Sequence, residues 1–227
     1  MSERSELDAR TDVVGTAQHM ERAGLVVGTA GNVSARQGDG TICLTPSSTP
    51  YGEMTAEGLA VVDLDGAVVA GGQPSTEKAM HLACYQTFPE VGGVVHCHPL
   101  HASMFAVARQ PIPAVIEEVI VYVGGDVPVA EYRTTGTDDL AAEVVRHLHN
   151  RGAVLMANHG LLCVGRSAAD ALHTALVVEH TAHIVWGATA LGGVVPLPEK
   201  VVKDFSGVYE YLRRETWRPH QAATGAV

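Results

Sequence analysis

Apolar positions recur with two different periods along the chain, and these periods predict an alternation of helices and short strands. Over residues 5–22 apolar side chains recur every three or four positions, which is typical of one helix, and Gly24 is expected to end it. The following segments are short, β-rich and separated by Gly- and Asp-rich turns. They predict strands near 32–35, 41–44, 59–62 and 67–69.

The rest of the chain continues this alternation. Helices are expected from Ser75 to just before Pro89, over 104–108, over 140–150 with Thr137 as the cap, from Ser167 to about Leu191, and over 199–213. Strands are expected at 93–98, 120–123, 127–129, 153–156 and 161–164. Since strands and helices are interleaved, the pattern predicts a layered α/β domain with a mixed or antiparallel-rich sheet. No repeat or linker divides the chain, so we expect one domain over 1–217 and a disordered tail over 218–227.

Composition and charge exclude several classes of protein. Apolar residues make up 46% and charged residues 18% of the 227 positions, which is globular composition. The formal charge of −10 argues against a nucleic-acid partner. The sequence has no apolar run long enough for a membrane span and no signal-peptide core at its start, so we expect a cytoplasmic protein that does not bind membranes. Its four cysteines are scattered, whereas twelve histidines are unusual for this length.

Three of these histidines have the spacing of a metal site. His96 and His98 alternate with Val95 and Cys97 along a predicted strand, so both imidazoles point to the same side, about 6.6 Å apart. A third imidazole, His159, lies in an Asn-His-Gly turn after another predicted strand. Three histidines with an open position are typical of a catalytic zinc site rather than a closed structural one. The alternative is that all three are buried, hydrogen-bonded core histidines.

A carboxylate and three polar loops add further candidate chemistry. Glu77 is expected in the first turn of a helix, where it is either an acid/base group or an ordinary solvated carboxylate favoured by the helix dipole. The loops 28–34, 44–49 and 74–77 combine glycines, hydroxyl side chains and free backbone N–H groups, which suit an anion. Each loop alone is equally typical of an ordinary turn.

Five motifs in a fixed order nevertheless resemble one known family. They are Gly-Thr-Ala-Gly-Asn-Val-Ser (28–34), Leu-Thr-Pro-Ser-Ser-Thr-Pro-Tyr (44–51), Pro-Ser-Thr-Glu (74–77), Val-Val-His-Cys-His-Pro (94–99) and Asn-His-Gly (158–160). This set resembles the class II aldolase/adducin head family from about residue 5 to 215. The resemblance implies a three-layer α/β/α fold with a largely antiparallel central mixed sheet. It also implies a homotetramer with active sites at the subunit contacts.

The resemblance also implies an activity and a set of site residues. The implied enzyme is a zinc-dependent carbon–carbon lyase of carbohydrate metabolism, with manganese or cobalt as alternative ions. It would cleave a ketose 1-phosphate, such as L-fuculose 1-phosphate, to dihydroxyacetone phosphate and an aldehyde. Glu77 corresponds to the catalytic carboxylate, which also contacts the metal when substrate is absent. The implied metal ligands are His96, His98 and His159, and the implied phosphate-binding positions are Gly31, Asn32, Ser47, Ser48, Ser75 and Thr76.

One departure from the family pattern keeps other functions open. The family aldolase has a tyrosine after an Ile-Pro-Ala stretch, but here 112–114 is followed closely by Glu117 and Glu118. Three tyrosines remain candidates for a proton donor: Tyr122, Tyr209 and Tyr211. The two glutamates favour a metal-dependent decarboxylase of a hydroxylated acid as an alternative. A sugar-phosphate epimerase is a second alternative, although it carries aspartate in place of Glu77. A non-enzymatic, adducin-head-like assembly protein is a third, which the presence of all three histidines disfavours.

Overall fold

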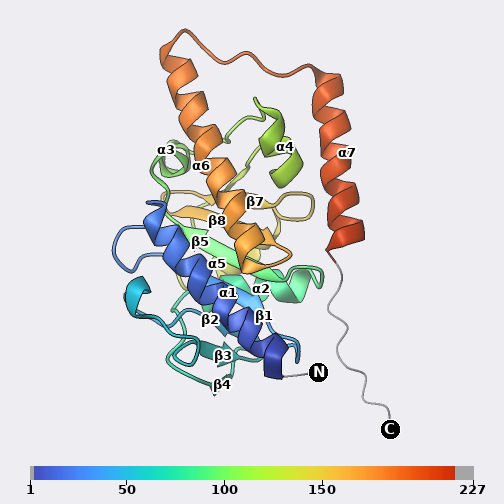
Figure 1. The fold of residues 1–227 in the computed structure, drawn as a ribbon. Coiled ribbons are helices and arrows are strands. Elements are labelled where there is room, and N and C mark those ends of the chain that lie inside the picture. The colour runs from blue at the N-terminus through green and yellow to red at the C-terminus, as the bar shows by residue number, and fades with distance from the viewer. Residues whose placement is uncertain (1–2, 218–227) are drawn as a thin grey trace.

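A central sheet with helices on both faces organises the chain (Figure 1). The computed structural model describes residues 3–217, and within them eight strands form the sheet. The strands are β1 (Asn32–Arg36), β2 (Ile42–Leu44), β3 (Ala60–Val62), β4 (Val68–Ala70), β5 (Gly93–Cys97), β6 (Val129–Ala130), β7 (Ala153–Met156) and β8 (Gly160–Gly165). The helices are α1 (Glu3–Arg22), α2 (Lys78–Thr87), α3 (Leu100–Ala108), α4 (Glu117–Val123), α5 (Asp138–Val145), α6 (Ala168–Ala190) and α7 (Glu199–Thr216), with a 3₁₀ turn η1 (Tyr51–Glu53).

The strand order places β1 and β8 on either side of β5. The full order is β4-β3-β2-β1-β5-β8-β7-β6, and each neighbouring pair is antiparallel except the parallel pair β6–β7. In this register Asn32 of β1 and Leu162 of β8 both lie opposite His96 of β5. The expected layered α/β fold with a largely antiparallel mixed sheet is therefore confirmed.

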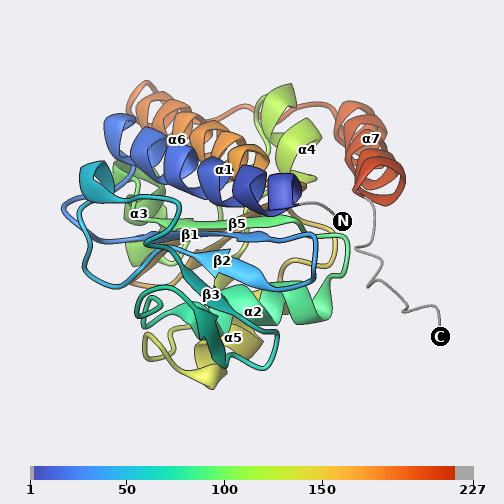
Figure 2. The ribbon, with the colours of Figure 1, turned by 60° about the horizontal axis from the view of Figure 1, so that its bottom comes forward.

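Two separate apolar cores fill the spaces between the sheet and its helix layers (Figure 2). On one face, α1, α3, α4 and α6 cover a core that includes Val95 and Cys97 of β5. On the other face, α2 and α5 cover a core that includes Val94 of β5 and Leu162 of β8. Since side chains alternate along a strand, His96 faces the same layer as Val94, which is the α2–α5 layer.

The strand expected at 120–123 is wrong, because this segment is the end of helix α4. Its β-branched composition favours a strand, but Val119, Ile120 and Val123 lie on one side of a helix and are fully buried against the α6 layer. Two glutamates in its first turn interact favourably with the helix dipole and so stabilise the helix. Gly124 ends the helix with a φ of +96°, a conformation that suits glycine. Tertiary packing therefore overrides the local strand preference.

Most other predicted elements agree with the structure to within a few residues. Thr137 and Ser167 cap α5 and α6 as expected, since each side-chain oxygen accepts a hydrogen bond from a backbone N–H three residues on. Helix α3 starts earlier than expected, directly after Pro99, and α5 ends earlier, at Val145. The predicted disordered tail at 218–227 lies outside the described residues. Among the helices of the described part, none is both long and apolar enough to cross a membrane.

Candidate metal centre

Three imidazoles meet where two neighbouring central strands, β5 and β8, end and begin. His96 is the fourth residue of β5, His98 follows that strand directly, and His159 lies in the turn that joins β7 to β8. Asn158 provides this turn with a left-handed φ of +56°, and its backbone N–H donates to Ala106 O of α3. The antiparallel pairing of β5 with β8 brings the turn beside the end of β5. The structure therefore brings together three histidines from two separate motifs of the sequence.

The nitrogen atoms of the three rings share a small volume. Their potential ligand atoms all lie within 4.8 Å of one another. His96 Nε2 and His98 Nε2 are 3.0 Å apart, and the ring of His159 lies 4.8 Å from that of His96 and 5.3 Å from that of His98 between centroids. His96 is fully buried, whereas the other two rings are half-buried. The cluster is therefore open on one side, as a catalytic metal site requires.

The hydrogen bonds of His96 fit a cation at the centre of the cluster. His96 Nδ1 lies 2.9 Å from Leu161 O, and a carbonyl oxygen only accepts hydrogen bonds. In a ring that binds a cation the proton is therefore on Nδ1, which leaves the lone pair of Nε2 for the ion. Burial, together with the neighbouring His96 and His159, lowers the pKa of His98 to about 4, so this ring is neutral near pH 7. Neutral imidazoles are the form that binds zinc and similar divalent ions.

The Glu77 carboxylate contacts two of the three imidazoles. It is the N-cap residue of α2, one position before the helical turn in which it was expected. Its Oε2 lies 3.3 Å from His96 Nε2 and its Oε1 lies 3.2 Å from His159 Nε2. Burial alone would raise the pKa of the Glu77 carboxyl, but the contacts with His159 and His96 and a hydrogen bond from Thr135 hold it far below its usual range. These contacts require positive charge between the carboxylate and the rings, either as protons on the imidazole nitrogens or as a bound cation.

The loops predicted to bind phosphate lie together beside Glu77. An isolated bridge between Pro46 and Pro74 and a hydrogen bond from Ser75 N to Thr45 O join the 45–49 loop to the 73–77 loop. Ser47, Ser48, Ser75 and Thr76 are half-buried or exposed, so solvent reaches them. Ser75 and Thr76 also line a surface cavity of about 470 Å³. The structure therefore joins two sequence-distant loops that bear hydroxyl groups into one rim, and the second loop leads directly into Glu77.

Gly31 and Asn32 complete this rim from the start of β1. Gly31 has a φ of +94°, and a Cβ at this position would lie 2.8 Å from His96 O, so only glycine lets the loop approach β5. Tyr51 OH lies 2.9 Å from Gly31 O and also donates to the preceding carbonyl, which fixes the loop. Asn32 is buried, and its Nδ2 donates to Glu77 Oε2 at 2.9 Å and to Ser75 Oγ at 3.1 Å. Asn32 thereby connects the carboxylate to the hydroxyl-rich loops.

Gly160 has the tightest packing around the histidine rings, and this allows a test. A Cβ at Gly160 would overlap His98 Cδ2 and lie 2.7 Å from Cys97 O. We expect Gly160→Ala to lower the free energy of unfolding by about 1–3 kcal/mol and to weaken zinc binding, because His98 must shift. Denaturant unfolding and zinc titration measure the two effects.

The matched control is Gly187→Ala in α6, where an added Cβ would meet nothing within 4 Å. This change is expected to stabilise the protein by about 0.5–1 kcal/mol through helix propensity and to leave zinc affinity unchanged. Wild-type zinc affinity in Gly160→Ala would mean that the packing of Gly160 does not position the His98 ring.

The residues considered for the aldehyde-side proton donor lie in the α6 layer of the chain. Tyr122 of α4 packs against His173 of α6 with ring centroids 4.5 Å apart, and Tyr211 of α7 is exposed. Tyr209 is buried, its hydroxyl accepts a hydrogen bond from Arg213, and burial raises its pKa. The two glutamates that favour the decarboxylase alternative, Glu117 and Glu118, are exposed in the first turn of α4. Within the described part of one chain, none of these side chains forms a hydrogen bond, ion pair or ring contact with the three imidazoles, which face the other layer.

Two residues at the site escape the sequence interpretation. Thr135 Oγ1 donates to Glu77 Oε1 at 2.6 Å from the loop before α5, and nothing in the local sequence indicates this. His81 Nε2 lies 2.5 Å from Asn32 Oδ1 and is fully buried. His81 follows Glu77 by four positions in a predicted helix, so the helical period places both on one side. This spacing of four residues is the sequence signal from which His81 could have been predicted.

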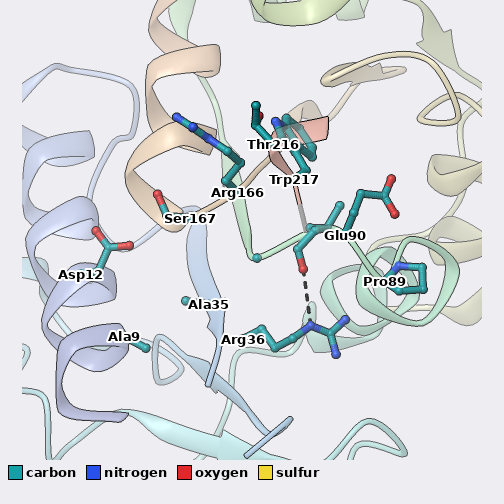
Figure 3. Close-up of a pocket in the computed structure, with 12 residues that line it drawn as sticks. Ala9, Asp12, Ala35, Arg36, Pro89, Glu90, Arg166, Ser167, Thr216 and Trp217 are labelled. Carbon is teal, nitrogen blue, oxygen red and sulfur yellow. Dashed lines mark hydrogen bonds between the residues drawn. The ribbon is translucent and has the colours of Figure 1, made fainter. Parts of the chain in front are cut away.

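A second surface cavity of about 470 Å³ lies away from the histidines, between α1, β1 and the N-terminus of α6 (Figure 3). Its charged side chains already have protein partners. The dashed line in Figure 3 marks the hydrogen bond from Arg36 Nε to Val91 O, and Arg36 Nη2 also donates to Tyr85 O. Arg166 pairs with Asp170, and Asp12 accepts hydrogen bonds from the first backbone N–H groups of α6. These contacts join α1 and β1 to the neighbouring elements, which indicates a structural role for these charged groups.

Comparison with known proteins points to one family. The family model described as the class II aldolase and adducin N-terminal domain matches residues 11–186. The L-fuculose phosphate aldolase of Escherichia coli O6:H1 is 36% identical over 185 residues, which cover 82% of this chain and 86% of that protein. The L-ribulose-5-phosphate 4-epimerase of Salmonella paratyphi C is 38% identical over 186 residues, covering 76% of this chain and 81% of that protein. Relatives of the same family thus catalyse two different reactions.

Solved structures give the same result for the fold. An L-fuculose 1-phosphate aldolase superimposes with a TM-score of 0.85 at 32% identity, covering 92% of this chain and 98% of that one. A putative aldolase/epimerase/decarboxylase from Klebsiella pneumoniae superimposes with a TM-score of 0.82 at 30% identity, covering 88% and 99% of the two chains. The likeness therefore extends over nearly the whole sheet and both helix layers.

Proposed function

Because the chain belongs to the class II aldolase and adducin N-terminal domain family, we propose that it is a metal-dependent aldolase acting on a sugar phosphate. The proposed reaction is the cleavage of a ketose 1-phosphate, such as L-fuculose 1-phosphate, to dihydroxyacetone phosphate and an aldehyde. The observation that carries this proposal is the cluster of three imidazoles, two of them in contact with one carboxylate, beside two hydroxyl-bearing loops. We propose zinc as the ion, with manganese and cobalt as alternatives, because a set of three imidazole ligands accepts each of them.

The division of labour follows from the donor set. His96, His98 and His159 would hold the cation, which supplies Lewis-acid stabilisation of negative charge on substrate oxygens. Glu77, a carboxylate in the resting site, would receive the proton that the hydroxyl group of the departing fragment loses as it becomes the aldehyde, relayed by the group on the aldehyde side. It would then give this proton to the substrate carbon that loses its partner when the C–C bond breaks, so one proton is lost, one is gained, and no water is consumed. Burial of Glu77 beside the imidazoles keeps this proton transfer away from bulk solvent.

The phosphate group would be bound by hydroxyl and backbone groups without a lysine. Ser75 Oγ accepts from Asn32 Nδ2 and from Glu77 N, so its own O–H is available as a donor. Ser47, Ser48 and Thr76 present further hydroxyl groups on the same rim, and Gly31 allows close approach of the backbone. This arrangement suits an anion that is recognised by several hydrogen bonds at a defined distance from the metal.

A sugar-phosphate epimerase is the second candidate, and one specific observation favours it. A ribulose-phosphate epimerase is as similar in sequence to this chain as the fuculose-phosphate aldolase is. Both reactions would use the same metal ligands and the same phosphate rim. Position 77 is glutamate in this chain, whereas the resemblance implies aspartate at this position in the epimerases. This difference supports the aldolase.

One experiment separates the candidates. Purified, zinc-loaded protein is incubated with a panel of ketose 1-phosphates, L-ribulose 5-phosphate and hydroxylated acids. We expect dihydroxyacetone phosphate to accumulate, as a coupled glycerol-phosphate dehydrogenase assay measures. An epimerised pentose phosphate without C–C cleavage would assign the epimerase, and carbon dioxide would assign the decarboxylase.

We also propose that the protein works as a homotetramer with active sites at subunit contacts. The supporting observation is that Tyr122, Tyr209 and Tyr211 lie in the α6 layer, away from the imidazoles of their own chain. A proton donor on the aldehyde side would therefore come from another copy. Analytical ultracentrifugation of the zinc-loaded protein determines the assembly, and an active monomer would contradict this proposal.

A further inference from the structure

A chain of buried polar side chains connects the interior of the α2 layer to the candidate site. Tyr85 OH lies 2.8 Å from Ser34 Oγ, and Ser34 Oγ lies 2.7 Å from His81 Nδ1. On its other side His81 Nε2 lies 2.5 Å from Asn32 Oδ1. The four side chains are at most 3% exposed, and Ser34 and His81 are completely buried. Buried polar groups arranged in this way require every donor to face an acceptor.

The direction of each hydrogen bond follows from the carboxylate at the end of the chain. The amide nitrogen of Asn32 faces two oxygens that can accept, Glu77 Oε2 at 2.9 Å and Ser75 Oγ at 3.1 Å, which leaves the amide oxygen for His81. Asn32 Oδ1 therefore points to His81, and His81 Nε2 must carry a proton. Burial lowers the pKa of His81 to about 3, so the ring is neutral and its Nδ1 accepts a hydrogen bond. Ser34 then donates to Nδ1 and accepts from Tyr85 OH.

This ordering has a consequence for both ends of Asn32. With Oδ1 held by His81, both amide protons are directed outward, one to Glu77 Oε2 and one to Ser75 Oγ. A half-turn of the amide would place its oxygen against the carboxylate and its nitrogen against the protonated His81 Nε2. Both new contacts would be unfavourable, because they would oppose two acceptors and two donors.

We propose that His81 is a positioning residue that locks the Asn32 amide, and thereby orients the Glu77 carboxylate and frees the Ser75 hydroxyl to bind phosphate. The proposal deepens the function proposed above and rests on it for the catalytic role of Glu77. His81 does not touch the substrate in this account. It acts only through Asn32, from the buried side of the sheet, and the lock requires a proton on Nε2.

The first test measures the lock directly and does not depend on any enzymatic activity. Nitrogen-15 labelling of the histidines reports which ring nitrogen carries a proton, and the His81→Gln spectrum identifies the signals that belong to His81. At neutral pH we expect a neutral His81 with its proton on Nε2. A ring whose only proton is on Nδ1 would overturn the proposal, because Nε2 could not then donate to Asn32.

The second test compares two variants of zinc-loaded protein. His81→Leu removes the donor to Asn32, whereas His81→Gln retains an N–H for Asn32 and an acceptor for Ser34. We expect His81→Leu to weaken the binding of inorganic phosphate, measured by calorimetry, and to lower kcat, each by roughly 10- to 100-fold, because hydrogen bonds to charged groups are involved. His81→Gln is expected to recover most of both losses, with zinc content unchanged in the two variants.

The control for a weakened α2 helix is Cys84→Ala, a buried position three residues beyond His81. It is expected to lower thermal stability while phosphate affinity and kcat stay at wild-type values. Equal losses in His81→Leu, His81→Gln and Cys84→Ala would show that His81 is merely structural. Lack of phosphate binding by the wild type would overturn the claim about Ser75. Failure of every sugar phosphate to react would overturn the aldolase proposal and leave the tautomer and phosphate results in place.

Discussion

Replacing Glu77 by Gln is expected to lower kcat by about 10²- to 10⁴-fold, because a positioned proton donor contributes this much to a carbon–carbon cleavage. The glutamine is isosteric, so its side-chain carbonyl still accepts a hydrogen bond from Asn32 or from Thr135, but it can no longer take up a proton and pass it on. The effect is measured as the rate of dihydroxyacetone phosphate release from the best substrate of the panel, with the zinc content determined on the same samples.

The matched control is Glu57→Gln, which makes the same chemical change at an exposed position. It is expected to retain full activity. If Glu77→Gln kept both zinc and wild-type turnover, the acid/base role would be wrong. If it lost zinc together with activity, the main role of Glu77 would be to hold the cation.

Removal of one imidazole is expected to have an effect of similar size on metal binding. We expect His159→Ala to weaken zinc binding by more than about 100-fold, which exceeds the 10- to 100-fold typical of residues that only support a ligand. Activity at limiting zinc should fall in parallel. His159 is preferred to His96 because it lies half-buried in a turn, whereas His96 is fully buried in the centre of the sheet. Competition with a fluorescent chelator measures the affinity.

His180→Ala serves as the control, since this histidine is exposed on α6. It is expected to leave zinc affinity and activity unchanged. Stoichiometric, tight zinc binding by His159→Ala would mean that the third ring is not a ligand, and the candidate site would then reduce to the His96–His98 pair and Glu77.

The core of the site could be predicted from sequence because strand periodicity is strict. His96 lies on β5 and His98 directly follows it, so the two imidazoles point to the same side of the sheet. The intervening Cys97 is buried in the core on the other side. Thr137 and Ser167 likewise indicate helix starts because their side chains satisfy the first backbone N–H groups. The pairing of the Asn-His-Gly turn with the His-x-His strand rests instead on the family resemblance, since neither period nor composition indicates which strands are neighbours.

What the sequence leaves out depends on contacts between distant segments. Thr135 reaches Glu77 only because α5 packs against α2, and a loop threonine carries no local signal of such a contact. The register that places Asn32 opposite His96 is also a tertiary property, set by how the two cores fill. Helix α4 shows the opposite case, in which a clear local preference for a strand loses to the packing of Val119, Ile120 and Val123. Local sequence patterns therefore predict helices and strands more reliably than they predict which of these elements are in contact.

The turn that carries His159 has a further thermodynamic consequence. His159 meets His96 and His98 only while β8 is hydrogen-bonded to β5, so a cation that needs all three rings binds the native chain and not the unfolded one. By mass action, free ion at a hundred times its Kd would add about 2.7 kcal/mol to the folding equilibrium. A cell that withholds the metal would then lower the folded fraction of the polypeptide, and with it its lifetime, as well as its activity.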